Sequence, residues 1–249
     1  MRQLSSALAR RMPTMANAAW RLLFPLYRKE IRWAGDEYGT DRKETFETIY
    51  RENRWNSTES RSGTGSTLDQ TILLRRRLPA ILSRLNARTL LDAPCGDYHW
   101  MKSVTLPDGV AYIGGEIVAA LVADLDARHG RPGVRFIALD IVADPLPAAD
   151  VWLCRDVLFH LSNADILATL RNFAESDISY ILTTTYPFGV GNRDIRSGGF
   201  RYINLTEPPF SLPRPRRSID DFLAPEAPRK LALWSREEVG SALQALPIA

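Results

Sequence analysis

Thr89-Leu90-Leu91-Asp92-Ala93-Pro94-Cys95-Gly96-Asp97 is the stretch that decides the expected fold. Apolar residues run into an acid, and Gly96 then permits a tight turn before a second acid. Buried parallel strands of open α/β sheets end in this way, because their carboxyl ends present polar groups to a ligand. The stretch therefore predicts a strand over residues 89–93 that ends at a binding site.

Strand and helix patterns alternate after this stretch. We expect strands at residues 111–115, 134–139, 151–154 and 180–184, and helices at residues 119–129 and 165–174. A helix is expected before the first strand, over residues 67–86, with Ser66 as its N-cap. Beyond residue 185, Gly and Pro dominate, with a short strand expected at 201–205 and a last strand and helix at 230–234 and 235–246. The alternation predicts an α/β fold with a Rossmann-like, doubly wound, mostly parallel sheet and a helical lead-in at the N-terminus.

The chain of 249 residues fits one catalytic domain with additions. We expect a basic helical arm at residues 1–45 and the domain at residues 46–249. Within the domain, residues 88–185 are expected to form the core sheet and residues 186–249 to lie on the substrate side.

Composition limits the class of protein. The chain is 24% charged and 45% hydrophobic, as is usual for a globular protein, and no apolar run approaches the ~20 residues of a membrane-spanning helix. A net charge of +3 suits a phosphate-bearing substrate but is too small to indicate a nucleic-acid partner. Cys95 and Cys154 have no metal-binding spacing, which predicts reduced thiols, no metal and a cytoplasmic location.

Residues 1–29 contain six Lys or Arg residues and no acid, interleaved with Leu, Met, Trp and Phe. The continuous apolar core of a secretory signal is missing, which disfavours secretion. Two interpretations remain open. The arm either docks on the domain or covers its site, or it is a basic amphipathic segment that makes peripheral contact with an anionic membrane.

Four acids, Asp92, Glu116, Asp140 and Asp156, each follow an expected strand. Since carboxyl ends of parallel strands share one edge of a sheet, we expect these acids to meet in one crevice. A carboxylate at Glu116 can accept both hydroxyls of a ribose, and Asp140 can accept from the amine of adenine with Ile141 against the ring. Each acid alone is equally consistent with a helix cap or a solvated turn, but together they indicate an adenosyl ligand.

Two other nucleotide-binding classes fit less well. A dehydrogenase needs G-x-G-x-x-G after the first strand, and Asp97, Tyr98 and His99 break that pattern. The loop at residues 56–66 lacks the lysine of a P-loop, so a nucleoside triphosphate is not implied. Its glycines, Gly63 and Gly65, either precede a helix N-terminus that holds a carboxylate or phosphate, or only shape a linker.

Residues 89–97 resemble motif I of the class I S-adenosylmethionine-dependent methyltransferases. A bacterial subgroup of this superfamily, with SGxGS and DxPCGD motifs, is similar to the chain over about residues 45–235. The resemblance departs from the superfamily pattern in two ways. Of the usual three glycines only Gly96 is present, with Pro94 and Tyr98 at the outer positions, and Glu116 stands where Asp is common. The similar segments are Ser62-Gly63-x-Gly65-Ser66, Leu91-Asp92-x-Pro94-Cys95-Gly96-Asp97, Tyr112-Ile113-Gly114-x-Glu116-Ile117, Cys154-Arg155-Asp156 with His160-Leu161, and Asn204-Leu205 before Pro208-Pro209-Phe210.

The resemblance implies an enzyme that uses S-adenosyl-L-methionine as its cofactor. Asp156 and His160 are the candidate catalytic residues, because they follow the fourth strand and His changes charge near neutral pH. A helix-capping or core role is the alternative for His160. The residues expected to bind the cofactor are Trp55, Ser62, Gly63, Asp92, Pro94, Cys95, Gly96, Asp97, Glu116, Ile117, Asp140, Ile141 and Arg155.

The acceptor is expected to be a small molecule or a carbohydrate that is methylated on oxygen. An RNA acceptor is one alternative, bound by the basic arm and by Arg214-Pro215-Arg216-Arg217. A non-catalytic cofactor-binding member of the fold is the other, suggested by the missing glycines. Acceptor recognition is expected from the arm, from residues 184–201 and from residues 214–217.

Overall fold

The computed structural model of the protein describes residues 12–27, 32–188 and 191–246. Part of the expected basic arm, residues 1–11 and 28–31, lies outside the described residues. In the described part, no helix is both long and apolar enough to cross a membrane.

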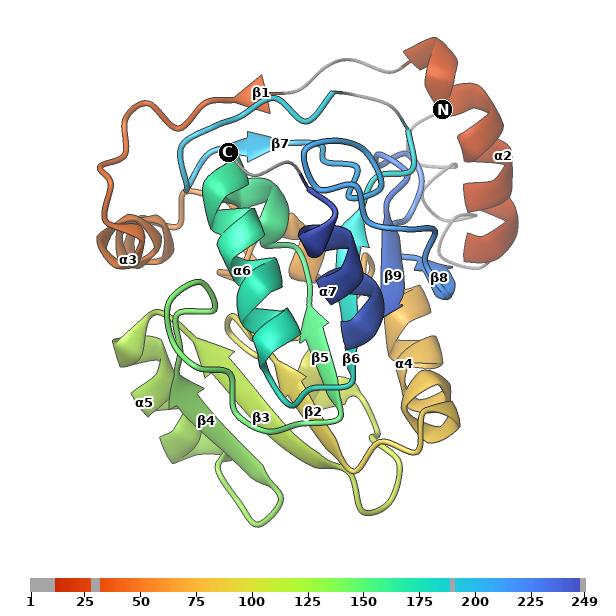
Figure 1. Cartoon of the computed structure of the whole chain (residues 1–249). Helices are drawn as coiled ribbons and strands as arrows, with labels where there is room; N and C mark the ends of the chain where they lie inside the picture. The colour runs from red at the N-terminus through yellow and green to blue at the C-terminus, as the bar shows by residue number, and fades with distance from the viewer. Residues whose placement is uncertain (1–11, 28–31, 189–190, 247–249) are drawn as a thin grey trace.

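A mostly parallel sheet forms the centre of the molecule (Figure 1). In the described part its strand order is β4-β3-β2-β5-β6-β9-β8. The strands from β4 to β6 are parallel, while β9 runs antiparallel to both β6 and β8. The expected α/β, Rossmann-like fold is therefore confirmed, and the sheet extends beyond the expected residues 88–185. The strands are β2 (Thr89–Asp92), β3 (Ala111–Glu116), β4 (Val134–Ala138), β5 (Val151–Cys154), β6 (Tyr180–Thr185), β8 (Arg217–Asp220) and β9 (Lys230–Ser235).

The order of the strands reverses between β2 and β5. From β2 the chain runs outward to β3 and β4, then returns to β5 on the other side of β2. Leu90 pairs with Val151 and Asp92 with Leu153, all in strands that neighbouring layers bury. Connections that leave the sheet in opposite directions open a crevice above the carboxyl ends of such strands, where ligands of doubly wound folds bind.

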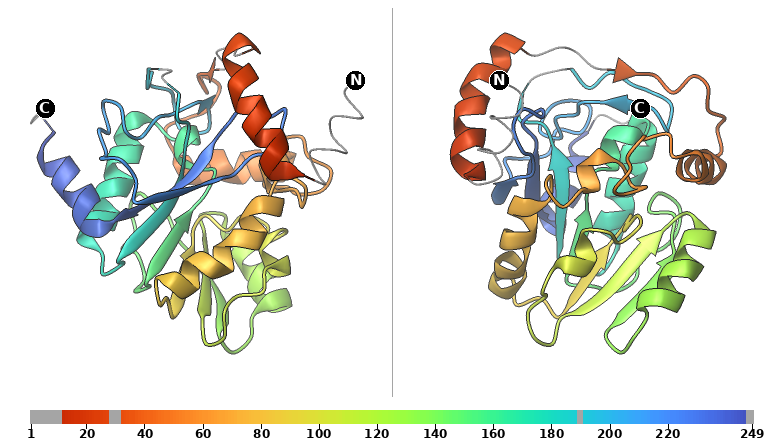
Figure 2. Two further views of the ribbon diagram at one scale, coloured as in Figure 1. Left: turned by 90° about the vertical axis from the view of Figure 1, so that its right-hand side faces the viewer. Right: turned by 180° about the vertical axis from the view of Figure 1, so that it is seen from behind.

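Helices cover both faces of the sheet (Figures 1 and 2). Helices α4 (Ile72–Arg84) and α5 (Ala119–His129) lie on one face, and α6 (Asn163–Glu175) and α7 (Arg236–Gln244) lie together on the other. Side chains fix two of the starts. Ser162 caps α6 by accepting from the Asp165 N–H, and Ser235 forms a capping box with Glu238 at α7.

Two expected elements are shorter than the sequence indicated. Helix α4 begins at Ile72 rather than at residue 67, and Ser66 is not its N-cap but the end of the 3-10 helix η1 (Thr64–Ser66). The Leu68 N–H donates to Glu59 at 2.7 Å, so residues 67–71 turn before the helix can start. The strand expected at 201–205 is only β7 (Phe200–Arg201), because the Leu205 N–H bonds Thr185 in the core instead of a strand partner.

A cap covers the carboxyl ends of the parallel strands. It consists of helix α2 (Pro13–Tyr27), helix α3 (Arg42–Glu52) and the two-stranded pairing of β1 (Arg32–Trp33) with β7 (Figure 1). The domain boundary expected at residue 45 falls inside α3. Helix α2 docks on residues 220–226, where the buried Asn17 side chain donates to the Phe222 carbonyl at 2.6 Å and accepts from the Ala224 N–H at 3.0 Å.

The substitution Leu153→Ala tests whether β5 lies at the buried centre of the sheet. Leu153 is fully buried in β5, so removing its side chain should leave a cavity and lower the free energy of unfolding by about 3 kcal/mol. Denaturant titration followed by circular dichroism measures the change. Leu68→Ala, at a residue that is 39% exposed, is the matched control and should stay within about 0.5 kcal/mol of the parent. Equal effects of the two changes would contradict the placement of β5 at the centre.

Candidate active site

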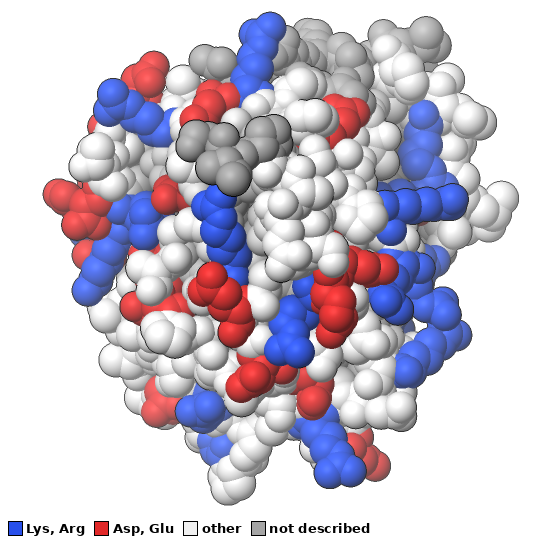
Figure 3. Space-filling model, viewed as in Figure 1, with Lys and Arg blue, Asp and Glu red and all other residues white. Residues whose placement is uncertain are grey.

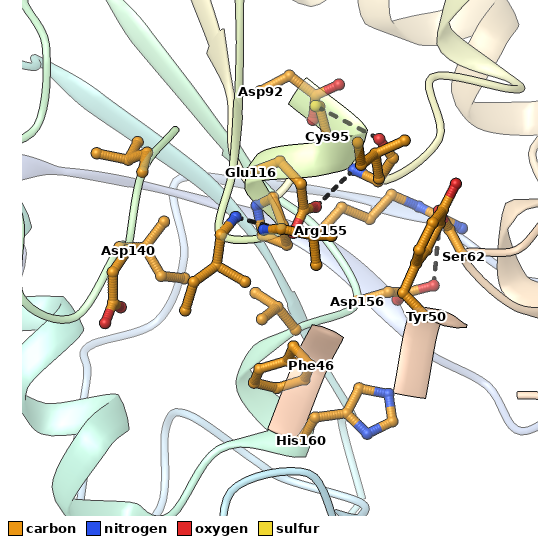
Figure 4. Close-up of a pocket in the computed structure, with 18 of the residues that line it drawn as sticks. Phe46, Tyr50, Ser62, Asp92, Cys95, Glu116, Asp140, Arg155, Asp156 and His160 are labelled. Atoms are coloured by element: carbon orange, nitrogen blue, oxygen red, sulfur yellow. Dashed lines mark hydrogen bonds and ion pairs between the residues drawn. The ribbon is translucent and has the colours of Figure 1, made fainter. Parts of the chain in front are cut away.

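One cavity lies at the carboxyl ends of β2, β3, β4 and β5, with a volume of about 940 Å³ counted to its open mouth. Figure 4 shows Asp92 and Glu116 on one side of the cavity and Phe46 and Tyr50 reaching in from α3 on the other. The expected site residues that line the cavity are Trp55, Ser62, Asp92, Pro94, Cys95, Gly96, Glu116, Ile117, Asp140, Ile141, Arg155, Asp156 and His160.

The cavity also has lining residues that the sequence did not indicate. Helix α3 supplies Arg42, Phe46 and Tyr50, and Trp100 and Leu139 come from loops after β2 and β4. The apolar face of α3 was visible as a periodic pattern, but its place over the sheet was not. The remaining lining residues are Ser66, Val118, Leu121, Val142, Val157 and Leu161.

Gly96 forms the turn after β2. Its φ of 54° lies in the left-handed region, and a Cβ there would collide with the Ser62 hydroxyl. A larger residue would therefore push the loop at residues 57–66 away from the strand ends. The Gly96 N–H donates to Glu116 Oε2 at 3.1 Å, which links the ends of β2 and β3.

Glu116 is buried, and backbone N–H groups hold its carboxylate. Besides the Gly96 bond, Oε1 accepts from the N–H of Ile117 at 2.9 Å and of Val118 at 3.3 Å. Burial raises the pKa of Glu116, and these bonds oppose the rise. A carboxylate offers about four acceptor positions, so roughly one remains for a ligand hydroxyl. To accept hydrogen bonds from two ribose hydroxyls, the Glu116 carboxylate has to give up the long bond from the Val118 N–H.

Asp92 is 2% exposed at the end of β2 and accepts from the Tyr112 hydroxyl at 2.7 Å. Burial raises its pKa to about 7, and the nearby Glu116 carboxylate adds to the rise. Arg155 and Tyr112 act in the opposite direction. The Asp92 carboxyl therefore changes charge near neutral pH when nothing else is bound beside it.

Asp140 is engaged on both oxygens. Oδ2 pairs with Arg42 of α3 at 2.9 Å, and Oδ1 accepts from the Val142 N–H at 2.9 Å. Arg42 also pairs with Asp165 at 2.9 Å, so it ties α3 to the edge of the sheet beside α6. In this arrangement Asp140 fastens the cap, and its expected contact with an adenine amine stays a prediction.

Asp97 and Gly63 lie outside the lining of the cavity. The Asp97 carboxylate accepts from the Ser60 hydroxyl at 2.9 Å, the Arg61 N–H at 2.8 Å and the Ser62 hydroxyl at 3.2 Å. It thereby holds the loop at residues 57–66 against the β2 turn. Gly63 packs behind Trp55, where a Cβ would lie 3.3 Å from the Trp55 Cβ. Both residues shape the wall of the site from behind.

Two arginines and two aspartates form a buried ionic cluster at the end of β5. Arg155 pairs with Asp221 at 2.8 Å, and Arg229 pairs with Asp156 at 3.2 Å and with Asp221 at 3.4 Å. Arg155 also contacts Asp156 at 3.3 Å. The charges balance, which makes the burial of four ionised groups tolerable. Asp221 and Arg229 were not indicated by the sequence, since nothing local marks them as partners of residues about 70 positions earlier.

The ionic cluster leaves no room for a side chain at Gly65. A Cβ there would come within 2.7 Å of Asp156 Oδ2, and the Gly65 carbonyl accepts from Arg155 at 2.9 Å. Asp156 itself has a left-handed φ of 54°, a conformation that costs a non-glycine residue roughly 1–3 kcal/mol. The Thr184 hydroxyl stabilises it by donating to Oδ1 at 3.1 Å while accepting from the Asp156 N–H at 3.0 Å.

His160 is fixed by the segment around β7. Its Nδ1 lies 2.7 Å from the Gly199 carbonyl, and its own carbonyl accepts from the Gly198 N–H at 2.7 Å. A carbonyl can only accept, so Nδ1 carries the proton and Nε2 keeps its lone pair in the neutral ring. The buried Arg201 holds the same turn by donating to the carbonyls of Leu158 and Leu161.

The two candidate catalytic groups differ in basicity. Burial, with a smaller contribution from Arg201, lowers the pKa of His160 to about 4 against the Gly199 hydrogen bond and Asp156, which raise it, so the ring is neutral at pH 7. Burial would raise the pKa of Asp156, but Arg155 and Arg229 outweigh it and lower the pKa. Both groups are therefore weak bases, but Asp156 is ionised and held by its arginines, whereas the neutral His160 has a free lone pair on Nε2.

No protein-family model matches the chain, and no curated protein matches it. Among solved structures, magnesium protoporphyrin IX methyltransferase from Synechocystis with bound SAH is 15% identical with a TM-score of 0.54, over 79% of this chain and 100% of that chain. Human N-acetylserotonin methyltransferase in complex with SAM is 15% identical with a TM-score of 0.54, over 93% of this chain and 69% of that chain.

A third similar structure is 1,6-didemethyltoxoflavin-N1-methyltransferase from Burkholderia thailandensis, with bound 1,6-didemethyltoxoflavin and S-adenosylhomocysteine. It is 17% identical with a TM-score of 0.51, over 78% of this chain and 86% of that chain. At such identities the likeness establishes the architecture alone. The chain therefore has the Rossmann-like fold of the class I S-adenosylmethionine-dependent methyltransferases.

Proposed function

We propose that the protein is an S-adenosylmethionine-dependent methyltransferase. One observation carries the proposal. Asp92, Glu116 and Asp140, from the ends of three neighbouring strands, line the same cavity as the Gly96 turn. An adenosyl ligand with a cationic end requires such a row of acids beside a bare backbone. We also infer, from the sequence motifs alone, that the chain belongs to the bacterial subgroup with SGxGS and DxPCGD motifs.

The cavity suits S-adenosyl-L-methionine along its length. Glu116 has an acceptor position left for a ribose hydroxyl, and Ile117 and Ile141 offer apolar walls for an adenine ring. Asp92 at the Gly96 turn favours a positively charged methionyl end, since its carboxyl ionises readily beside a cation. Trp55, Ser62, Pro94, Cys95 and Arg155 complete the proposed cofactor site, and Gly63 and Asp97 support it from behind.

S-adenosyl-L-methionine supplies an electrophilic methyl group on a sulfonium. The residues of the chain then have to align an acceptor, exclude water and take up a proton. Nε2 of His160 is the group we assign to the proton, because Gly199 holds the other nitrogen of the ring. Asp156 keeps its charge in the ionic cluster and stabilises the protonated His160 ring electrostatically.

A neutral imidazole base supports a hydroxyl acceptor and hence O-methylation. The enclosing cap supports a small molecule, and all three similar structures have names that specify small-molecule acceptors. Carbohydrate and RNA acceptors, the cytoplasmic location and the non-catalytic alternative stay predictions. A tritiated-methyl transfer screen with small-molecule, sugar, lipid-linked and RNA acceptors tests the acceptors and the non-catalytic alternative. Failure to bind either S-adenosylmethionine or S-adenosylhomocysteine would end the proposal.

Glu116→Gln should weaken cofactor binding by about tenfold or more, because an amide loses charge and presents one acceptor atom in place of two. Isothermal titration with S-adenosylhomocysteine measures the affinity. Glu47→Gln, on the part of α3 that does not line this cavity, is the control and should leave the affinity unchanged. Full affinity in the Glu116 variant would remove the ribose assignment.

Asp92 should make cofactor binding depend on pH. A bound cation favours the ionised form of Asp92, so cofactor binding below about pH 7 releases a proton. As the pH is raised towards 7, the affinity should increase by up to about tenfold per pH unit, and above pH 7 it should level off. Titration calorimetry in two buffers with different ionisation enthalpies measures the proton released. Asp92→Asn should abolish the release, and an unchanged proton count in that variant would assign the effect to another group.

His160→Ala should lower kcat by roughly 100-fold or more for a hydroxyl acceptor while cofactor affinity stays the same. His129→Ala, at the end of α5, is the control. The base acts when neutral, so kcat of the parent enzyme, measured at saturating cofactor at each pH, should fall only as the pH drops towards about 4. A fall centred near pH 6.5, the value for an ordinary histidine, would contradict the role assigned to this buried ring.

A further inference from the structure

Helix α2 has two unlike faces. Its inner face docks on the domain through Asn17 and through Phe24, whose ring centroid lies 5.1 Å from that of Phe188. Its outer face presents Met15 at 64% exposure and Leu22 at 82%. Of the six large apolar side chains that are exposed in the described residues, three lie on this helix and a fourth directly precedes it. They are Met12, Met15, Leu22 and Leu23.

The outer face carries no charge to offset this exposure. Arg21 is the one charged residue between Met12 and Tyr27, and it pairs with Asp220 of β8 at the side of the helix. Alanines at 18 and 19, also exposed, fill the space between Met15 and Leu22. Contiguous exposed apolar surface of this kind marks an interaction site more often than it marks bare protein surface.

Arginines border the helix on the same side of the molecule. The Arg21–Asp220 pair joins α2 to β8, and α4 packs against β8. Exposed arginines lie along both elements and just before β8, and Figure 3 shows basic side chains gathered on the right-hand edge over them. Arg216 pairs with Glu238, but the others have no ion pair with any described residue. These others are Arg76, Arg84, Arg214 and Arg217.

We propose that the outer face of α2, together with the arginines beside it, binds the surface of an anionic lipid bilayer. The face consists of Met12, of Met15, Leu22 and Leu23 of α2, and of Arg76, Arg84, Arg214 and Arg217. An uncharged helix face buries itself in the boundary between headgroups and acyl chains, while neighbouring cations attract acidic headgroups. Stable attachment needs two such signals, and this face has both.

Charge complementarity favours lipid over a second copy of the chain. Arg76, Arg84, Arg214 and Arg217 form no ion pair with any described residue, so two copies facing each other here would bring like charges together. An anionic bilayer meets the same residues with opposite charge. The proposal concerns the surface alone and does not depend on the reaction at the cavity.

Vesicle flotation with the full-length chain tests the proposal. Neutral phosphatidylcholine vesicles and vesicles that contain phosphatidylglycerol are compared. We expect binding to the anionic vesicles, with affinity falling as salt is raised because the cations are exposed. No binding to anionic vesicles, or equal binding to neutral ones, would overturn the proposal.

Two variants separate the two signals. The double substitution Met15→Gln with Leu22→Gln should reduce binding at least about tenfold by removing apolar burial. Arg214→Gln with Arg217→Gln should reduce it by roughly fivefold for each arginine. The matched controls, Leu68→Gln and the pair Arg51→Gln with Arg128→Gln, change exposed residues elsewhere and should bind vesicles as the parent does.

Sedimentation and cofactor titration complete the experiment. S-adenosylhomocysteine affinity should be the same in all these variants, which shows that they fold and separates this test from that of the cavity. If analytical ultracentrifugation finds a dimer that the Met15 and Leu22 substitutions dissociate, the face belongs to a second copy and the lipid proposal is wrong.

Discussion

The parallel pairing of β2 with β3 on one side and β5 on the other is the constraint on which the site depends. It brings residues that lie far apart in sequence to one edge of the sheet, where Asp92, Glu116 and Asp156 follow in adjacent strands. Placing acids so close together under a cap is costly, because burial penalises each charge and like charges repel. Each acid is compensated in a different way, and those differences give the acids distinct chemistry.

Glu116 is compensated by backbone N–H groups, Asp156 by two arginines, and Asp92 only by a hydroxyl and a more distant cation. Consequently Asp156 is firmly ionised, while Asp92 retains a proton to near neutrality. A site in which one carboxyl is left incompletely compensated is ready to ionise when a cationic ligand arrives. Under the proposed function, this uneven compensation suits Asp92 to a cationic ligand.

Buried apolar side chains of α3, Phe46 and Ile49, belong to the same core as the sheet, and polar contacts add to the attachment of the segments above it. Arg42 bridges Asp140 and Asp165, Asp97 holds the loop at residues 57–66, and Arg155 binds the carbonyl of Gly65. Arg42, Asp140 and Arg155 also line the cavity, whereas Asp97 and Gly65 lie behind its wall.

Aromatic rings connect the cap to the candidate base. Phe24 of α2 contacts Phe188, which contacts Tyr186, which in turn contacts Phe159 beside His160, with centroid separations of 5.1, 5.6, 6.0 and 4.6 Å along the series. The inner face of α2 is thus continuous with the wall that carries His160. Of the two interpretations of the arm, docking describes this inner face, whereas the outer face carries the proposed contact with lipid.

The sequence by itself determined the alternation of strands and helices, the turn at Gly96 and the acids after each strand, because buried parallel strands and tight turns leave local patterns. Only the tertiary structure decided that α3 covers the cavity and that Asp140 pairs with its Arg42. It also decided that Asp221 and Arg229 neutralise Arg155 and Asp156. Finally, it placed the Gly199 carbonyl where it sets the tautomer of His160. These contacts join residues that are far apart along the chain and that share no periodic signal. Their energies depend on burial and on the position of partner charges, which exist only once the sheet has formed.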